Sequence, residues 1–341
     1  MPAADSRVLV TGATGFLGGA VLENLAAHGH EAFASGRNAE LLTRRSDSAH
    51  SVRGDLRSLA AARLEVDAVI HCAALSTPWG RWREFQAANI DGTRAVIDFV
   101  RRNGVRRLVH VSSPSIYAAP RHRLDISEDD VDEQNRLNGY IRSKIAAERM
   151  LQRAHAAGDI PELVIIRPRG LIGVGDPSLM PRMLEVHDRI GVPLLGGGQH
   201  PIDVTAVENV AHALRLALTE GDPDGGVYNI TNGEPRAFRE LLTGLLTRMG
   251  ITPRLRPLNR RMGWMLASAL EGACTALPWH PEPPLTRYTF TTIAYAQTLD
   301  ISRARTELGY APEVSLDEAL DRVAAHLSEE RRARVDQGRA A

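Results

Sequence analysis

The stretch Thr11-Gly12-Ala13-Thr14-Gly15-Phe16-Leu17-Gly18 decides the fold class of this chain. It lies between an apolar run, Arg7–Val10, and a segment with helical spacing of its apolar residues, Phe16–His28. In this setting Gly12 permits a tight turn, Gly15 lets the backbone approach a pyrophosphate, and Gly18 lets the helix pack closely against the strand. The N–H groups at the helix N-terminus then face the phosphate oxygens. The glycines and their context together predict a dinucleotide-binding turn.

Outward from this turn, apolar runs alternate with helical segments along the first half of the chain. Strand–helix alternation of this kind predicts right-handed crossovers and a parallel sheet. We therefore predict an α/β fold with a Rossmann doubly wound parallel sheet, whose ligand lies at the carboxyl ends of the strands. The expected strands are Arg7–Val10, Glu31–Ala34, Ala68–Cys72, Arg107–Val111 and Leu163–Ile166, and the expected helices are Phe16–His28, Trp82–Asn103 and Gly139–Ala157.

The second half of the chain has a different pattern, with several helical segments and proline-rich breaks. A short apolar run, Val227–Ile230, is expected to return to the first sheet. We predict a dinucleotide-binding domain over residues 1–170, a smaller and mainly substrate-binding domain over 171–330, and a charged, frayed tail over 331–341. The expected helices are Pro177–Ile190, Val207–Leu218, Phe238–Met249 and Leu316–Leu327.

Composition excludes several classes of protein. The 41 basic and 41 acidic side chains balance, which argues against general affinity for nucleic acid or an anionic membrane. The two cysteines, Cys72 and Cys274, provide neither a disulfide framework nor metal-ligand spacing, so we expect no metal and a reducing compartment, the cytoplasm. The N-terminus lacks the pattern of a signal peptide, and no apolar stretch is long enough for a transmembrane helix.

The end of the second strand bears on the choice of cofactor. NAD-specific enzymes place an acid there against the ribose 2′-OH, whereas this chain has Gly36 followed by Arg37. A guanidinium at this place can pair with a 2′-phosphate, so we predict that NADP (NADPH) is preferred and NAD is the alternative. Arg37 as a solvated loop charge is the competing interpretation. Asp55, followed by Leu56, is placed either to touch the adenine edge or simply to form a turn.

Tyr140 and Lys144 form the candidate catalytic pair. They are four residues apart at the start of an expected helix, so they share one face. A nearby ammonium favours the phenolate and lowers the tyrosine pKa, which is about 10 in a free side chain. Tyr140 could then exchange a proton with a carbinol oxygen while hydride moves to or from the cofactor. The same spacing is common on surface helices, so the pair needs support from other features.

That support comes from an ordered set of motifs. Ser112-Ser113-Pro114-Ser115-Ile116-Tyr117 follows the expected strand Arg107–Val111, and Asn89-Ile90-Asp91-Gly92-Thr93 lies in the preceding helix. Together with the glycine turn, Asp55, His71-Cys72-Ala73-Ala74, Tyr140–Lys144 and Arg167-Pro168, this set resembles the extended short-chain dehydrogenase/reductase family over residues 7–175.

The resemblance implies roles for individual residues. It implies Ser113, Tyr140 and Lys144 as the catalytic triad, with Ser113 preferred over Ser112 because it lies four residues before Tyr117. It implies Asn89 as a support of the cofactor or active site, and a homodimer through Trp82–Asn103 and Gly139–Ala157. The predicted cofactor-binding residues are Gly12, Thr14, Gly15, Phe16, Leu17, Gly18, Arg37, Asp55, Leu56, Ala73, Asn89, Tyr140, Lys144 and Pro168.

The second half is similar to the 3β-hydroxysteroid dehydrogenase branch, which includes sterol-4-carboxylate 3-dehydrogenases and bacterial β-keto acid reductases. The motifs are Ile166–Gly173, Asp203–Val210 and Tyr228–Pro235. We therefore predict an oxidoreductase that interconverts a ketone and a secondary alcohol on a largely apolar small molecule. A nucleotide-sugar epimerase and a non-catalytic NADP sensor are the alternatives. A dehydratase is disfavoured because Pro114 stands where such enzymes carry an acid.

Met262–Leu277 is apolar around most of its expected helix, with a narrow polar stripe at Ser268, Glu271, Gly272 and Thr275. So wide an apolar face needs something to cover it. Three interpretations are open: an ordinary core helix, a lid over an apolar substrate, or a helix that dips into a membrane interface.

Overall fold

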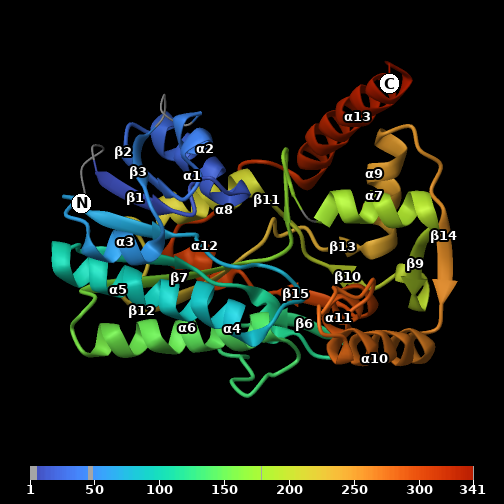
Figure 1. Cartoon of the computed structure of the whole chain (residues 1–341), viewed down its shortest axis with the longest axis horizontal. Helices are drawn as coiled ribbons and strands as arrows, with labels where there is room; N and C mark the ends of the chain where they lie inside the picture. The colour runs from blue at the N-terminus through green and yellow to red at the C-terminus, as the bar shows by residue number, and fades with distance from the viewer. Residues whose placement is uncertain (1–5, 45–48, 178, 341) are drawn as a thin grey trace.

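The computed structural model describes residues 6–44, 49–177 and 179–340, with side chains as far as residue 333. Figure 1 shows a large sheet with its helices at one end of the molecule and a smaller group of helices and short strands at the other. The predictions about an N-terminal signal and about the last residue of the tail fall on residues 1–5 and 341, which lie outside the described residues.

Seven parallel strands form the large sheet, in the order β12-β7-β5-β4-β1-β2-β3. The order reverses at β1, next to the glycine turn, as in a doubly wound sheet. The predicted fold class is thus confirmed, and the late segment around Val227 does return to this sheet. The strands are β1 (Arg7–Thr11), β2 (Glu31–Gly36), β3 (His50–Arg53), β4 (Ala68–His71), β5 (Arg107–Val111), β7 (Glu162–Pro168) and β12 (Asp224–Ile230).

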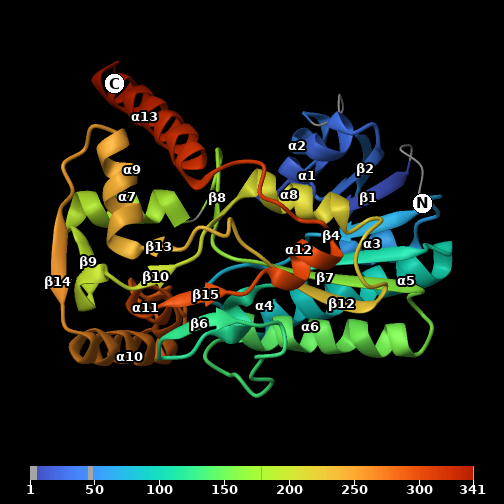
Figure 2. The same cartoon turned by 180° about the vertical axis from the view of Figure 1, so that it is seen from behind.

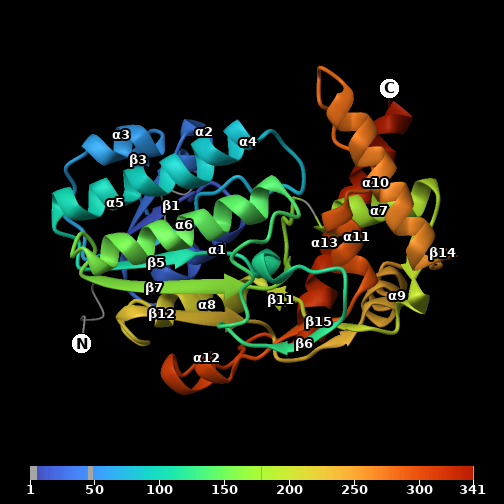
Figure 3. The same cartoon turned by 90° about the horizontal axis from the view of Figure 1, so that it is seen from below.

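Helices cover both faces of this sheet, because β1, β4, β5 and β7 carry apolar side chains toward both sides. One face packs against α1 (Phe16–Ala27) and α8 (Val207–Leu216), with the short α2 (Ala39–Thr43) beside β2. The other face packs against α3 (Leu56–Ala61), α5 (Gly92–Asn103) and α6 (Gly139–Ala156). Figure 3 shows α5 and α6 side by side across that second face.

The segment predicted as one helix over Trp82–Asn103 is divided into three parts. It begins as α4 (Trp82–Phe85), widens into a π-helical turn over Gln86–Asp91, and continues as α5. The wide turn contains Asn89, whose side chain is 2% exposed and faces the sheet edge. Such π-turns occur mostly inside α-helices and frequently at functional sites.

The smaller region is built from short strands and helices. A four-stranded mixed sheet has the order β13-β10-β15-β6, and two strand pairs, β8 with β11 and β9 with β14, flank it. Figure 2 shows β6 and β15 next to each other near α11. The strands are β6 (Arg123–Ile126), β8 (Leu171–Ile172), β9 (Val192–Leu195), β10 (Pro201–Ile202), β11 (Thr205–Ala206), β13 (Arg236–Ala237), β14 (Leu255–Leu258) and β15 (Gln297–Leu299).

The helices of this region are mostly those that periodicity predicts. α7 (Leu179–Arg189) and α9 (Phe238–Arg248) match the expected segments within a few residues. The final helix, α13 (Leu316–Ala340), does not fray after Leu327 but continues through most of the charged tail. The remaining helices of this region are α10 (Arg260–Ala276) and α11 (Arg287–Ala294), whereas α12 (Ser302–Glu307) packs beside β12 of the large sheet. Turns of 3₁₀ type occur at Pro114–Tyr117 and Gly196–Gly198.

The structure contradicts the core-helix interpretation of α10. Only Gly263, Ala267 and Glu271 of this helix are buried, whereas Met262 is 64% and Met265 is 70% exposed. Glu271, a member of the predicted polar stripe, faces inward and pairs with Arg287 of α11 at 2.6 Å. The helix therefore turns an acid toward the protein and an apolar face outward. No helix in the described part of the chain has the length and apolar character to cross a membrane.

Candidate active site

The glycine turn after β1 has the shape that its sequence predicts. Gly12 has φ of 70°, and a Cβ on it would lie 2.8 Å from the backbone of Ala73. A Cβ on Gly18 would collide with the carbonyl oxygen of Gly12, so α1 approaches β1 as closely as two backbones can. Gly15 begins α1 without a side-chain cap, which leaves the N-terminal N–H groups to be satisfied by another partner. This open cradle fits a dinucleotide pyrophosphate.

A buried histidine connects the turn to its neighbours. The Nδ1 atom of His71 lies 2.7 Å from the hydroxyl of Thr11, and its Nε2 atom lies 3.2 Å from the hydroxyl of Thr93. The backbone N–H of Ala73 also donates to Thr11 Oγ1 at 3.3 Å. Burial lowers the pKa of His71 to about 3, so the ring is neutral at physiological pH. These contacts explain why the His71–Ala74 motif accompanies the glycine turn.

At the end of β2, Gly36 occupies the position where NAD-specific enzymes carry an acid. A Cβ on Gly36 would lie 2.9 Å from the Thr14 side chain, so an aspartate there would displace its neighbour. Arg37 is exposed beside it, and Arg53, which the sequence analysis did not single out, lies opposite Gly36 in the register of β2 and β3. Two guanidinium groups thus stand at this edge of the sheet.

Asp55 is the N-cap residue of α3. Its Oδ1 atom accepts a hydrogen bond from the Ser58 N–H at 2.8 Å and caps α3, and this bond lowers the carboxyl pKa. Capping by aspartate is the ordinary role of the residue at a helix start. Leu56 begins α3, half-buried behind this cap, next to Gly92 of α5. The turn-forming interpretation accounts for Asp55, and contact with adenine stays a prediction.

The other predicted cofactor residues line the same side of the sheet. Phe16 lies against Gly173, since a Cβ on that glycine would be 3.0 Å from the Phe16 ring. Leu17 packs partly buried on the core beneath α1. Pro168 is buried at the end of β7, two strands from β4 in the sheet order. All of these lie at or beyond the carboxyl ends of parallel strands, where doubly wound sheets bind ligands.

Tyr140 lies in the first turn of α6, where Asn138 caps the helix by accepting from the Ile141 N–H at 2.8 Å. Its side chain is 7% exposed, and its hydroxyl lies beside the side chains of Ser113 and Ser76. Burial raises the tyrosine pKa above its ordinary value, and the influence of these two serines offsets part of that effect. The structure therefore brings Tyr140 and Ser113 together from a helix and a strand end.

Lys144 follows one helical turn later and is buried. Its Nζ atom donates to the carbonyl oxygen of Val111 at 2.7 Å and lies 3.5 Å from His110 Nε2. Burial lowers the pKa of Lys144 to about 8. The expected lowering of the Tyr140 pKa by this ammonium is not the dominant effect, because the ammonium is directed at β5 and burial of the phenol outweighs other influences.

A chain of hydroxyl groups extends the site beyond the predicted residues. Ser113 donates to Ser115 at 3.0 Å, and the Ser115 hydroxyl lies 2.5 Å from the hydroxyl of Tyr288 in α11. Ser76 and Ser115 had a sequence signal, because both follow strands whose carboxyl ends form the site. Tyr288 had none, since it is 173 residues from Ser115 in the chain. Ser112, the serine that we did not prefer, has a buried hydroxyl without a partner among the described residues.

Asn89 joins three elements beside Tyr140. Its Oδ1 atom accepts from the Leu75 N–H at 2.7 Å, and its Nδ2 atom donates to Leu75 O at 3.1 Å and to Ser143 Oγ at 2.8 Å. These bonds hold the backbone just before Ser76 against α6. The π-turn thus gives Asn89 a supporting role toward Tyr140.

Two other motif residues support the fold rather than the site. The Asp203 carboxylate accepts from the Leu299 N–H, and Asn209 Oδ1 accepts from the N–H groups of Glu313 and Val314. Each side chain therefore ties together segments that are about 100 residues apart in the chain.

The segment after α10 approaches the site. Trp79 donates from Nε1 to the carbonyl oxygen of His280 at 3.2 Å, and Arg81 donates to the carbonyl oxygen of Pro278 at 2.6 Å. Trp79 is three residues beyond Ser76, and Tyr288 follows in α11. The α10–α11 region, defined as residues 260–294, therefore touches the rim of the Tyr140 centre at two places.

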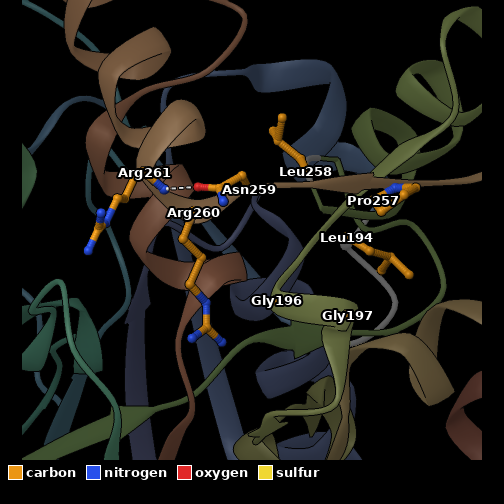
Figure 4. Close-up of a pocket in the computed structure, with 8 residues that line it drawn as sticks. All are labelled: Leu194, Gly196, Gly197, Pro257, Leu258, Asn259, Arg260 and Arg261. Atoms are coloured by element: carbon orange, nitrogen blue, oxygen red, sulfur yellow. Dashed lines mark hydrogen bonds between the residues drawn. The ribbon is translucent and has the colours of Figure 1, made fainter.

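A separate hollow of about 580 Å³ lies at the start of α10. Figure 4 shows its residues, with Arg260 and Arg261 directed to different sides and the Arg261 N–H bonded to Asn259 at 2.8 Å. It shares no lining residue with the Tyr140 centre. In the described part of the chain no cluster of histidine, cysteine or acidic residues could hold a metal ion.

Comparison with known proteins agrees with this geometry. Residues 8–231 match the model of the NAD dependent epimerase/dehydratase family, and the chain belongs to this family. It is 33% identical to the 2-alkyl-3-oxoalkanoate reductase of Stenotrophomonas maltophilia, over 94% of this chain and 98% of that protein. It is 29% identical to the mouse decarboxylating sterol-4-alpha-carboxylate 3-dehydrogenase, over 93% of this chain and 89% of that protein.

The fold also matches solved structures. MoeE5 in complex with UDP-glucose and NAD is 25% identical, with a TM-score of 0.74 over 95% of this chain and 99% of that chain. The chain is thus an NAD(P)-dependent oxidoreductase of the extended short-chain dehydrogenase/reductase type.

Proposed function

We propose that the protein interconverts a ketone and a secondary alcohol on a largely apolar small molecule, either a β-keto/β-hydroxy acid or a sterol-like compound. The observation that carries the proposal is the buried Tyr140 hydroxyl, which lies beside Ser113 at the carboxyl end of β5. Two hydroxyl groups that meet at one point can hold a single substrate oxygen between them. The named relatives are reductases and dehydrogenases of oxo acids and sterol carboxylates, which supports the substrate class.

In this mechanism Tyr140 is the acid in ketone reduction and the base in alcohol oxidation. Ser113 holds the substrate oxygen, and the Tyr140 proton passes to that oxygen as the carbonyl becomes an alcohol. A bound nicotinamide cofactor supplies or accepts the hydride. Because burial raises the Tyr140 pKa, the hydroxyl stays protonated at neutral pH and is ready to donate. Lys144 keeps a positive charge one turn away and, through Val111, fixes α6 against β5.

NADP is the preferred cofactor in this proposal. The carboxylate that would select NAD is absent, and a Cβ added at Gly36 would meet the Thr14 side chain at 2.9 Å. Arg37 and Arg53 provide positive charge at the same edge, as a 2′-phosphate requires. Homodimer formation through α5 and α6 stays a prediction.

A nucleotide-sugar epimerase is the second candidate, because the chain matches an epimerase/dehydratase family and the fold of a protein solved with UDP-glucose. The dehydratase reaction is less suited, since Pro114 begins the 3₁₀ turn after Ser113 and offers no acid.

One assay separates the candidates. The purified protein is mixed with NADPH or NADP⁺ and a panel of long-chain 3-oxo and 3-hydroxy compounds, sterol ketones and small ketones, and absorbance of the reduced nicotinamide is followed. UDP-glucose and UDP-galactose are incubated in parallel and analysed by NMR. We expect absorbance changes with the apolar compounds and none of the sugar interconversion. Turnover confined to nucleotide sugars would replace the proposal by the epimerase.

A further inference from the structure

Arg169 carries a buried guanidinium that has no hydrogen-bonding partner among the described residues. It follows β7 directly, and its side chain is 7% exposed. Its Nε atom is enclosed with no acceptor, and no hydrogen bond or ion pair in residues 6–44, 49–177 and 179–340 reaches its guanidinium. A guanidinium has five N–H donors and stays charged, so an arginine in this state needs acceptors from elsewhere.

Arg167, two residues earlier, is a buried arginine with a structural role, and its hydrogen bonding can be compared with that of Arg169. It is 3% exposed, and its guanidinium is fully engaged. It forms two hydrogen bonds to Glu148, at 3.0 and 2.6 Å, and further bonds to Tyr117 and to the carbonyl oxygen of Glu128. Both arginines are buried, and the contrast in their hydrogen bonding indicates that the Arg169 guanidinium is available for a partner that is not part of the described chain.

The surroundings of Arg169 place it beside the reacting centre. β7 and β5 are adjacent, and the Ser112 N–H donates to Ile166 O at 2.7 Å, so Arg169 and Ser113 leave neighbouring strand ends at the same sheet edge. Burial lowers the pKa of the Arg169 guanidinium, while Tyr288 and Asp203 act in the opposite direction. Tyr288 is the same residue that lies 2.5 Å from Ser115 in the hydroxyl chain that leads to Tyr140.

Asp203 is the acid whose charge acts on Arg169, but the two form no ion pair among the described residues. Its carboxylate accepts from the Leu299 N–H at 2.7 Å. Burial raises the Asp203 pKa to about 6, so this carboxylate is itself weakened as an anion. A positive charge with unsatisfied N–H donors therefore remains at the sheet edge where β5 leads to Ser113, near Tyr288.

We propose that Arg169 binds the carboxylate of the substrate and thereby selects 3-oxo and 3-hydroxy acids over ketones and alcohols without an acid group. The inference rests on the proposed function. In such an acid the carboxyl carbon is separated from the carbonyl carbon by one carbon, so one small molecule can present an oxygen to Tyr140 and an anion to Arg169. The planar guanidinium matches a carboxylate through two parallel hydrogen bonds. Arg169 is a specificity-determining residue in this scheme, and it takes no part in proton transfer.

The test compares a long-chain 3-hydroxy acid with its methyl ester, both oxidised with NADP⁺ by the wild type, Arg169→Met and Arg169→Lys. Methionine keeps an unbranched side chain and removes the charge, and lysine keeps the charge without the planar fork. Arg153→Met, on the exposed side of α6, is the matched control for loss of one arginine. NADPH binding and Tm of each variant are measured first.

We expect the wild type to have a lower KM for the 3-hydroxy acid than for its methyl ester. Arg169→Met should raise KM for the acid by about 10- to 100-fold, the usual value of charge-assisted hydrogen bonds, and leave kcat/KM for the ester within about twofold. Arg169→Lys should fall between, and Arg153→Met should match the wild type. An equal loss on acid and ester, with folding intact, would show a structural role and overturn the inference, as would equal wild-type kcat/KM for the two compounds.

A second measurement needs no variant. A saturated fatty acid of matching length should inhibit oxidation by the wild type competitively, and its methyl ester should inhibit at least about tenfold more weakly. Equal inhibition would contradict carboxylate binding. Failure of the proposed function gives a different result, since then neither the acid nor the ester is oxidised.

Discussion

Helices α6 and α10 are nearly equal in length, but α6 buries several polar side chains whereas α10 exposes apolar ones. α6 buries Tyr140, Ser143, Lys144 and Glu148 beneath the large sheet, and each residue has a hydrogen-bonding partner. α10 buries a single acid, Glu271, and exposes Met262, Met265 and Leu266. Buried polar groups persist only where partners satisfy them, so α6 marks a preorganised site and α10 a surface helix held at one face.

The largest effect that tests this comparison is expected for Tyr140→Phe. The ring and its packing remain while the proton donor is removed, so kcat should fall by about 10²- to 10⁴-fold with cofactor affinity nearly unchanged. Steady-state kinetics and fluorescence titration with NADPH measure the two quantities. Lys144→Ala should instead lower both kcat and the affinity for NADPH. Wild-type kcat in Tyr140→Phe would end the proposed mechanism.

The pH dependence of the wild type belongs to the same test. Because burial raises the Tyr140 pKa, the phenol remains protonated through neutral pH. Ketone reduction should therefore hold across neutral pH and decline only as alkaline solution removes the proton. Alcohol oxidation should instead rise with pH, because it requires the deprotonated base.

The second prediction compares one ion pair of each helix. Glu148→Gln in α6 leaves the buried Arg167 without its anion and should reduce the free energy of unfolding by about 3–5 kcal/mol. Glu271→Gln in α10 affects Arg287, whose side chain is 44% exposed and can turn to water, so the loss should be about 1 kcal/mol. Urea unfolding of both variants gives the difference. Similar losses would show that the two pairs are equally enclosed.

The third prediction concerns the cofactor side of the sheet. Arg37→Ala should weaken NADPH binding by about tenfold and leave NADH binding nearly unchanged, because only the former has a 2′-phosphate. Arg44→Ala is the control, since Arg44 is an exposed arginine that pairs with Glu40 in α2. Fluorescence titration gives both affinities. An unchanged NADPH/NADH ratio in Arg37→Ala would make this residue a solvated loop charge.

The smallest effect is expected for Met265→Ser on α10. At 70% exposure the side chain buries little surface, so stability should change by no more than about 0.5 kcal/mol. Thermal unfolding measures the change. A clear destabilisation would mean that the outer face of α10 is covered in solution.

The sequence by itself determined the large sheet, its glycine turn and the Tyr140–Lys144 pair. Each depends on local rules: a turn that only glycine permits at Gly12, strand and helix periods, and the spacing of one helical turn. For the same reason the predicted bounds of β5 and α6 agree with the structure within one residue. Local rules also indicated a polar stripe on α10, but they did not indicate which face of the helix would pack against the rest of the chain.

Only the tertiary structure decided the rest of the site. Tyr288 joins Ser115 across 173 residues, and Ser76 reaches Tyr140 because Asn89 holds its neighbouring backbone. Within the described part of the chain, the Arg169 guanidinium has no partner, although Arg167 in the same motif is hydrogen-bonded to Glu148. The burial and pairing of a side chain depend on segments that are distant in the chain, and a single sequence does not specify those distances. The outward apolar face of α10 has the same origin, because the Glu271–Arg287 pair turns the helix.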